Sequence, residues 1–324
     1  MRHHAMFWVT MLMMLFAQDV PASFPQATIT NGRVRAVVLL PDAGAGYYRG
    51  TRFDWSGAVA SLRAGDHEYF GPWFETHDPT GHDGITGPVE EFQAGESSVG
   101  YAEAAAGGTF VRIGVGHVRK PEEPAYRRFG TYQIVDPGTW TVARAADRIT
   151  FTHVLGEAGG YAYEYVKTLR LDGDALVIDH VLRNTGRKRI ETLVYDHNFF
   201  TLDRQPTAPP VIVRFPFDPK PLRPVEPFGE MAGRELRFRK ALGKGEHVFT
   251  EFEGFGPTAA DYDFRLEHAE TGAGVRIRGD RPIAKLIFWS ASRTACPEPY
   301  VDASVDPGQQ TTWQIRYDFY EVKR

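Results

Sequence analysis

Cysteine is almost absent from this chain, because Cys296 is the only one in 324 residues. No disulfide can form within the chain, so a large buried core has to stabilise the fold without covalent cross-links. An excess of basic charge is also lacking, since the formal net charge is −4. Nucleic-acid-binding proteins usually present a basic face, so this balance argues against a nucleic-acid partner.

Long apolar runs are missing except near the start of the chain. Arg2 and two histidines precede the apolar run AMFWVTMLMMLFA at residues 5–17, and the small residues of VPAS follow it. A basic start, an apolar core too short to span a bilayer and a small residue at Ala22 are typical of a secretory signal. We therefore predict a signal peptide over residues 1–22, a secreted or periplasmic protein, and no membrane span after cleavage.

Sustained helical periodicity is lacking in the remaining residues, 23–324. Runs rich in β-branched and aromatic residues recur instead, and Gly, Pro, Asn and Asp separate them. The longest of these runs are at 109–118, 148–155, 161–171, 175–182, 284–290 and 311–320. So many short strands in one chain predict an all-β fold, a large antiparallel sandwich or barrel in a single domain.

The clearest hairpin lies in TLRLDGDALVIDHVL, where Asp172 and Gly173 tolerate the positive φ of a tight turn. On its second strand, period-2 alternation predicts one shared face for Leu176, Ile178, His180 and Leu182.

Several catalytic signatures are absent. No glycine-rich phosphate loop follows a strand and opens a helix, and no Gly-x-Ser-x-Gly elbow occurs, which disfavours nucleotide binding and serine hydrolysis. His77 and His82 lack the i, i+2 strand spacing and the i, i+4 helical spacing that bring two imidazoles to one ion. We therefore predict neither a metal nor a cofactor, with a metal near these two histidines as the weaker alternative.

Polar residues nevertheless interrupt the apolar strands. His197 lies in LVYDHNFFTLD, Glu298 stands between two prolines, and Glu90 and Glu91 end a loop rich in glycine and proline. Each has an ordinary structural explanation: a hydrogen-bonded core histidine, a solvated turn residue, and a charged edge that prevents pairing between sheets.

The order of these segments resembles the galactose mutarotase (aldose 1-epimerase) family. DHNFFTL at 196–202 is similar to its Asn-His-Ser/Thr-Tyr-Phe/Trp-Asn-Leu segment, although Phe199 and Thr201 depart from it. CPEPYVDASVDPGQQTTWQIRYDFY is similar to its C-terminal block, and RFDWSGAVASLRAGDHEYFG resembles an early strand of the family. The resemblance implies a galactose mutarotase-like β-supersandwich, a carbohydrate ligand and no cofactor; the oligomeric state stays open.

The resemblance also implies roles for individual residues. His197 falls on the family's general acid, Glu298 on its general base, and His82 on a histidine that contacts the sugar. Weaker candidates for sugar contact are Arg52, Trp73, Glu91, His117 and Trp289, and core packing is the alternative for each aromatic residue.

Acid–base chemistry gives this pair a physical rationale. Interconversion of anomers needs a base at the C1 hydroxyl and an acid at the ring oxygen. A carboxylate beside His197, either Asp196 or Glu298, is expected to keep the imidazole protonated near neutral pH. In a regular strand Asp196 points to the face opposite His197.

Two other functions fit the same sequence. One is lyase-type elimination from an acidic polysaccharide, which the unplaced histidines and the basic segment RKPEEPAYRR could serve. The other is a carbohydrate-binding or envelope protein without catalysis, and it predicts that His197 and Glu298 lie far apart or face away from a cleft.

Overall fold

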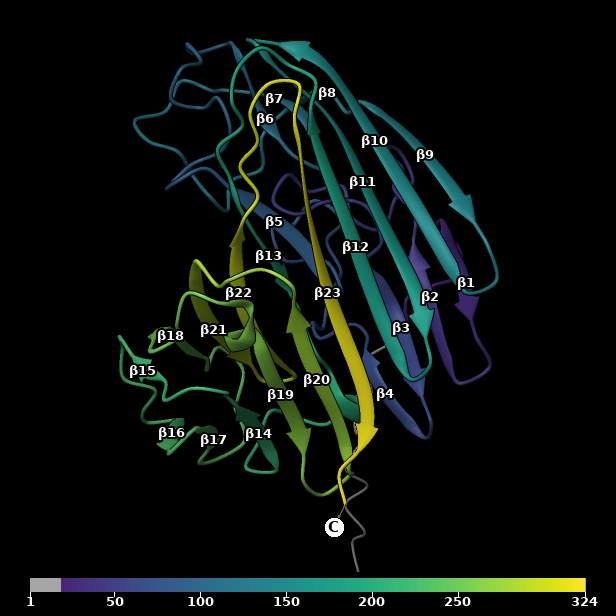
Figure 1. Cartoon of the computed structure of the whole chain (residues 1–324), viewed down its shortest axis with the longest axis vertical. Helices are drawn as coiled ribbons and strands as arrows, with labels where there is room; N and C mark the ends of the chain where they lie inside the picture. The colour runs from purple at the N-terminus through teal and green to yellow at the C-terminus, as the bar shows by residue number, and fades with distance from the viewer. Residues whose placement is uncertain (1–18, 324) are drawn as a thin grey trace, which may run out of the picture.

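The computed structural model describes residues 19–323, and it confirms the all-β prediction. Within this range the secondary structure consists of strands β1 to β23 and the short 3-10 helices η1 (Leu202–Arg204) and η2 (Ala259–Asp261). All registered strand pairs are antiparallel, and the strands pack as layers of one β-sandwich domain (Figure 1). No helix in the described range is long and apolar enough to cross a membrane.

Two large sheets form the sandwich. The ten-stranded sheet has the order β16 (Gly229–Ala232), β17 (Glu235–Phe238), β14 (Val211–Arg214), β19 (Asp263–His268), β20 (Ala273–Gly279), β23 (Gln310–Glu321), β12 (Ala175–Asn184), β11 (Tyr161–Asp172), β10 (Arg148–Ala158) and β9 (Thr139–Arg144). The six-stranded sheet has the order β15 (Lys220–Pro221), β18 (Val248–Glu253), β21 (Lys285–Ala291), β22 (Thr294–Asp302), β13 (Leu193–His197) and β5 (Val89–Gln93).

Two smaller sheets complete the fold. The four-stranded sheet contains β1 (Gln26–Thr30), β2 (Val34–Leu39), β3 (Val59–Ala64) and β4 (His67–Phe70). The three-stranded sheet contains β6 (Thr109–Arg112), β7 (Gly116–Arg119) and β8 (Ile134–Asp136), and it lies near one end of the sandwich (Figure 1).

The predicted hairpin is present and connects β11 to β12. Asp172 pairs with Ala175, and Gly173 has a φ of +60° in the turn. The predicted face of β12 is confirmed too, because Leu176, Ile178, His180 and Leu182 are all buried. Burying a large apolar side chain contributes about 1.5–3 kcal/mol, so this shared face holds β12 against the layer behind it.

The six-stranded sheet has one face in the main core and another that faces away from it. Val194 of β13, Leu286 and Phe288 of β21 and Val301 of β22 belong to the main hydrophobic cluster. Cys296 of β22 belongs to a second cluster on the other face. This two-sided burial decides where each alternate residue of β13 and β22 points.

The alternative explanation of Glu90 and Glu91 as a charged edge that prevents pairing between sheets is wrong. Strand β5 is indeed at the edge of its sheet, but both side chains are fully buried. Glu90 contacts Lys167 and His180 of the ten-stranded sheet, whereas Glu91 contacts arginines on the opposite face. Consecutive strand residues point to opposite faces, so each glutamate finds its own cationic partners.

Candidate active site

Strand alternation places the candidate residues on one face of the six-stranded sheet. On β13, Tyr195 and His197 share a face, and on β22 Glu298 and Tyr300 share a face. The Tyr195 and Tyr300 rings stack with centroids 4.2 Å apart, which shows that these are the same face of the sheet. A cavity of about 480 Å³ lies above this face, and both His197 and Glu298 line it.

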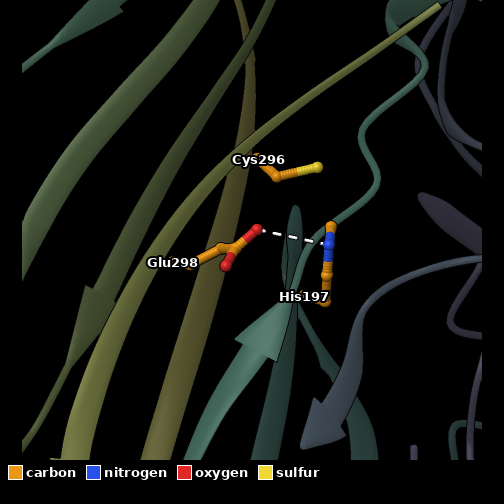
Figure 2. A group of neighbouring side chains, drawn as sticks. All are labelled: His197, Cys296 and Glu298. Carbon is orange, nitrogen blue, oxygen red and sulfur yellow. Dashed lines mark ion pairs between the residues drawn. The ribbon is translucent and has the colours of Figure 1, made fainter. Parts of the chain in front are cut away.

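His197 and Glu298 converge at this cavity. The Nε2 atom of His197 lies 3.3 Å from Oε1 of Glu298, and both side chains are about 5% exposed (Figure 2). The binding-protein hypothesis predicted that the two residues lie apart or face away from a cleft, and this geometry does not support it.

A side-chain hydrogen bond sets the gap between the two strands. Strands β13 and β22 pair only at Leu193 and Val194, so no backbone ladder joins them next to His197. Asn198, the residue after His197, donates from Nδ2 to the carbonyl of Pro297, the residue before Glu298, at 2.6 Å. The Asn198 amide therefore joins the strands between the Leu193–Val194 pairing and the Phe200–Ala295 backbone bridge, next to the two candidate catalytic side chains.

Asp196 lies on the opposite face, as predicted. Its Oδ2 accepts a hydrogen bond from the Tyr317 hydroxyl at 2.8 Å inside the main core. Burial, together with the nearby Glu90 carboxylate, raises the pKa of Asp196 to about 7. Asp196 is therefore not the carboxylate beside His197.

Aromatic rings surround His197. The Phe199 ring stacks on the imidazole at 3.7 Å between centroids, and the Phe53 and Trp289 rings meet it edge-on at 5.6 and 5.5 Å. Phe199 adopts a φ of +44°, a conformation that costs a non-glycine residue free energy and that occurs preferentially at functional sites. This unusual backbone turns the Phe199 ring onto the imidazole.

The expectation that His197 stays protonated near neutral pH is wrong. Burial in the aromatic enclosure lowers the pKa of His197 well below its ordinary value, and the positive charge of Arg52 lowers it further. Burial also raises the pKa of Glu298 to about 8. At neutral pH the proton of the pair is therefore on the Glu298 carboxyl group, and the imidazole is neutral.

This proton distribution differs from the one that the implied roles, His197 as acid and Glu298 as base, require. A neutral imidazole is a base, and a protonated carboxyl group is an acid. Glu298 Oε1 and His197 Nδ1 are buried without hydrogen-bond partners among residues 19–323. Such unpaired buried polar atoms are rare in folded proteins and here lie beside an open cavity, where a ligand could satisfy Oε1.

Behind the pair, the buried Glu91 carboxylate pairs with two partly buried arginines. Arg52 donates to Glu91 Oε2 at 2.8 Å, and Arg128 makes a bidentate pair with both carboxylate oxygens at 2.9 Å. The Tyr195 hydroxyl also donates to Glu91 Oε2, at 2.6 Å. These charges hold the pKa of Glu91 well below its ordinary value despite its burial. Glu91 thus orients Arg52 and Arg128, which line the cavity, but it does not line the cavity itself.

The other predicted sugar contacts divide into two groups. His82 and Trp289 line the cavity, and His82 lies 3.5 Å from the Asp83 carboxylate. Trp73 stacks on the far side of Phe199 at 5.1 Å and lines a neighbouring cleft instead. His117 is buried on β7, where Nε2 bonds the Gly156 carbonyl at 2.8 Å. This placement gives His117 a structural hydrogen bond and no position in the cavity wall.

Eight residues of the cavity wall were not among the predicted site residues. They are Asp83, Arg128, Phe129, Phe199, Arg223, His247, Phe249 and Ile287. Arg128 ends the basic segment RKPEEPAYRR, whose positive charge was the signal for it. Phe249 lies on β18 and Ile287 on β21, and the other residues lie on irregular loops, where no periodicity reports which way a side chain points.

Two groups of metal-ligand residue types occur among residues 19–323. His197, Cys296 and Glu298 bring ligand atoms within 4.8 Å of one another, as do Glu90, His180 and Asp196. Burial raises the pKa of the Cys296 thiol well above its ordinary value, and a protonated thiol is a poor ligand. The second group already contacts the Lys167 ammonium group. Neither group includes His77 or His82, and the His77 ring stacks on Tyr47 at 3.8 Å.

Comparison with known proteins establishes the fold. No family model matches the chain. No curated protein matches it in sequence. Among solved structures it is similar to the Slr1438 protein of Synechocystis sp. PCC 6803, at 13% identity and a TM-score of 0.57, covering 93% of this chain and 97% of that one.

Two further structures carry functional names. The GalM/aldose epimerase homologue from C. elegans is 16% identical with a TM-score of 0.56, covering 92% of this chain and 99% of that one. The galactose mutarotase related enzyme from Lactobacillus acidophilus is 14% identical with a TM-score of 0.55, covering 92% of this chain and 100% of that one. The chain therefore has the galactose mutarotase-like β-sandwich fold, as the sequence resemblance predicted.

Proposed function

We propose that this chain, which has the galactose mutarotase-like fold, is an aldose 1-epimerase-like enzyme that interconverts the anomers of a sugar. The observation that carries the proposal is the His197–Glu298 pair, 3.3 Å apart at the cavity. Burial raises the pKa of Glu298 to about 8, so its carboxyl group keeps the proton at neutral pH. One neutral imidazole and one protonated carboxyl group supply the base and the acid that ring opening needs, without a cofactor.

The proposed reaction is balanced in protons. His197 Nε2 takes the proton of the anomeric hydroxyl while the Glu298 carboxyl group gives its proton to the ring oxygen, and the bond between C1 and the ring oxygen breaks. The resulting aldehyde rotates about the C1–C2 bond. Ring closure then returns one proton to Glu298 and one from His197 to the new C1 hydroxyl.

The closeness of the two side chains fits this reaction. The anomeric oxygen and the ring oxygen are bonded to the same carbon, so the two proton-transfer groups have to be close neighbours. Hydrogen-bond reach is the geometric condition for general acid–base catalysis, and two groups at 3.3 Å can reach both oxygens. The Trp289 and Phe249 rings in the cavity wall offer apolar faces against which a sugar ring can pack.

We also propose that the protein is exported, because residues 1–22 have the pattern of a secretory signal. Residues 1–18 lie outside the part of the chain that the structure describes. Amino-terminal sequencing of protein from the periplasm or culture medium tests this, and a retained Met1 would refute it.

Polarimetry of freshly dissolved aldoses tests the proposed reaction. We expect the wild-type protein to accelerate mutarotation and His197→Gln and Glu298→Gln to lose about 10²–10⁴-fold of that rate. Matched controls are His67→Gln and Glu230→Gln, since both residues lie outside the cavity, in ion pairs with Asp203 and Arg239. Wild-type rates equal to buffer for every aldose would refute the proposal. A gain of ultraviolet absorbance on polyuronate would instead establish the elimination reaction.

A further inference from the structure

Positive charge exceeds negative charge at the cavity. Three arginines line it, Arg52, Arg128 and Arg223, whereas the acidic residues in its wall are Asp83 and Glu298. Asp83 lies 3.5 Å from His82, and Glu298 is protonated at neutral pH because burial raises its pKa to about 8. Burial lowers the pKa of His82, so His82 is uncharged and Asp83 is the one acidic residue of the cavity wall left to balance three arginines.

The charge imbalance continues behind the cavity wall. Glu91 is one carboxylate, yet Arg52 and Arg128 both pair with it, and the positive charge of the buried Arg112 also lowers its pKa. Buried positive charge without a matching carboxylate is energetically unfavourable unless an anion compensates it. Arg52 and Arg128 each bond through Nε and Nη2, and their Nη1 groups have no hydrogen bond among residues 19–323.

Arg223 presents an unpaired guanidinium group on another loop. It is exposed and, within the described residues, has neither an ion pair nor a side-chain hydrogen bond; its guanidinium lies 5.1 Å from the centre of the Phe249 ring. Its backbone is fixed, because the buried Thr250 hydroxyl bonds both the Arg223 N–H at 3.1 Å and its carbonyl at 3.0 Å. A held backbone keeps this unpaired cation at the cavity.

Three arginine–phenylalanine contacts thus border the same cavity. Arg223 lies over Phe249, and Arg52 and Arg128 lie over Phe129 at 4.7 and 5.4 Å. Phe129 is 54% exposed and Phe249 is 36% exposed, which is unusual for such large apolar side chains. A ligand with an apolar ring face and an anionic group would contact both the aromatic rings and the guanidinium groups.

We infer that the sugar bound in this cavity carries an anionic group, a carboxylate or a phosphate, which Arg223 and Arg128 bind while the sugar ring packs against Phe129 and Phe249. The inference rests on the proposed function, since it names the substrate class of the same site. A guanidinium group recognises carboxylate and phosphate in the same way, so separate titrations with sugars that carry each group show which of the two is bound.

Calorimetric titration measures binding directly and does not depend on turnover. The ligands are D-glucuronate and D-galacturonate for the carboxylate arm, D-glucose 6-phosphate for the phosphate arm, and D-glucose and D-galactose as neutral sugars. We expect at least one anionic sugar to bind at least tenfold more tightly than the neutral sugars at low salt, and to weaken as salt rises. If the uronates bind more tightly, the anionic group is a carboxylate; if the sugar phosphate binds more tightly, it is a phosphate.

Arg223→Gln tests the assignment of the residue, because that side chain makes no hydrogen bond within residues 19–323 and its loss leaves no buried partner. We expect it to weaken binding of the anionic sugar by about 10–100-fold and to leave neutral sugars unchanged. Arg187→Gln is the matched control, since Arg187 is exposed, pairs with Glu157 and lies outside the cavity. Equal binding of neutral and anionic sugars, or equal effects of the two substitutions, would overturn the inference.

Mutarotation rates on the same sugars separate this inference from the proposed function. Catalysis without preference for anionic sugars keeps the proposed function and overturns the inference. Binding of an anionic sugar that depends on Arg223 but gives no anomer exchange supports the ligand class and refutes the proposed function. Inorganic phosphate that binds as tightly as the sugars would show recognition of the anion alone and would overturn a sugar substrate.

Discussion

Replacing Glu298 by glutamine removes a titratable group from the cavity and keeps nearly the same shape. In the folded protein burial raises the pKa of Glu298 from 4.5 to about 8, whereas in the unfolded chain it is expected at its ordinary value. The folded state therefore binds this proton more tightly than the unfolded state. By linkage, the free energy of unfolding of the wild type falls as pH rises from about 4.5 to about 8, and levels off above that.

The size of this effect follows from the two pKa values. The rise in pKa from 4.5 to about 8 corresponds to a loss of about 5 kcal/mol in the free energy of unfolding at high pH. About 3 kcal/mol of it develops between pH 5 and pH 8. For a domain of this size, that free energy corresponds to about 5 °C in melting temperature.

Differential scanning calorimetry of wild type and Glu298→Gln at pH 5 and pH 8 measures this pH-dependent loss of stability. We expect the melting temperature of the variant, relative to wild type, to be about 5 °C higher at pH 8 than at pH 5. Burial lowers the pKa of His197 well below its ordinary value, so the imidazole is neutral in both proteins at pH 8. Glu230→Gln on the surface is the control. The same difference between the proteins at both pH values would refute the raised pKa and, with it, the assignment of Glu298 as the acid.

Three further outcomes follow from the site. The mutarotation rate should be level around neutral pH and fall as pH rises through about 8, because the Glu298 carboxyl group then loses the proton that it donates. Polarimetry corrected for the buffer rate measures the profile, and a rate that rises through that range contradicts the prediction. Asn198→Ala removes the hydrogen bond to the Pro297 carbonyl and the one that Asn198 accepts from the Tyr317 hydroxyl. It should lower the rate by about 10²-fold through misplacement of the two catalytic side chains, with a circular dichroism spectrum like that of wild type. An unchanged rate would show that the strands hold their spacing without these bonds. Glu91→Gln leaves Arg52 and Arg128 without the buried carboxylate that both pair with, and it should lower the free energy of unfolding by about 3–5 kcal/mol in urea titrations. Glu230→Gln should cause a negligible change, and equal changes for both variants would contradict a charge cluster around Glu91.

Much of the fold could be predicted from local sequence patterns. The alternation of apolar residues, the Asp172–Gly173 turn and the shared face of β12 are decided by neighbours in the chain, and all three are present in the structure. The same alternation correctly separated Asp196 from His197. His197 and Glu298 could be paired in advance only because their segments resemble those of a known family.

The proton distribution of the site could not be predicted in the same way. From the sequence, a carboxylate beside His197 was expected to hold the imidazole in its protonated form. The depth of burial decides otherwise, because removing both groups from water disfavours their charged forms and the neighbouring arginines oppose a charged imidazole. Burial depends on which sheets and loops cover the pair, and no local pattern encodes that.

The sequence by itself therefore determined an antiparallel β fold and the faces on which its strand residues point, since strand periodicity is a property of consecutive residues. Only the tertiary structure decided that Glu91 is a buried anchor for two arginines, that His117 is structural, and that Arg128 and Arg223 reach the cavity. These residues come from loops and strand edges far apart in the chain. Their positions depend on how the sheets pack, which is a long-range property of the whole domain.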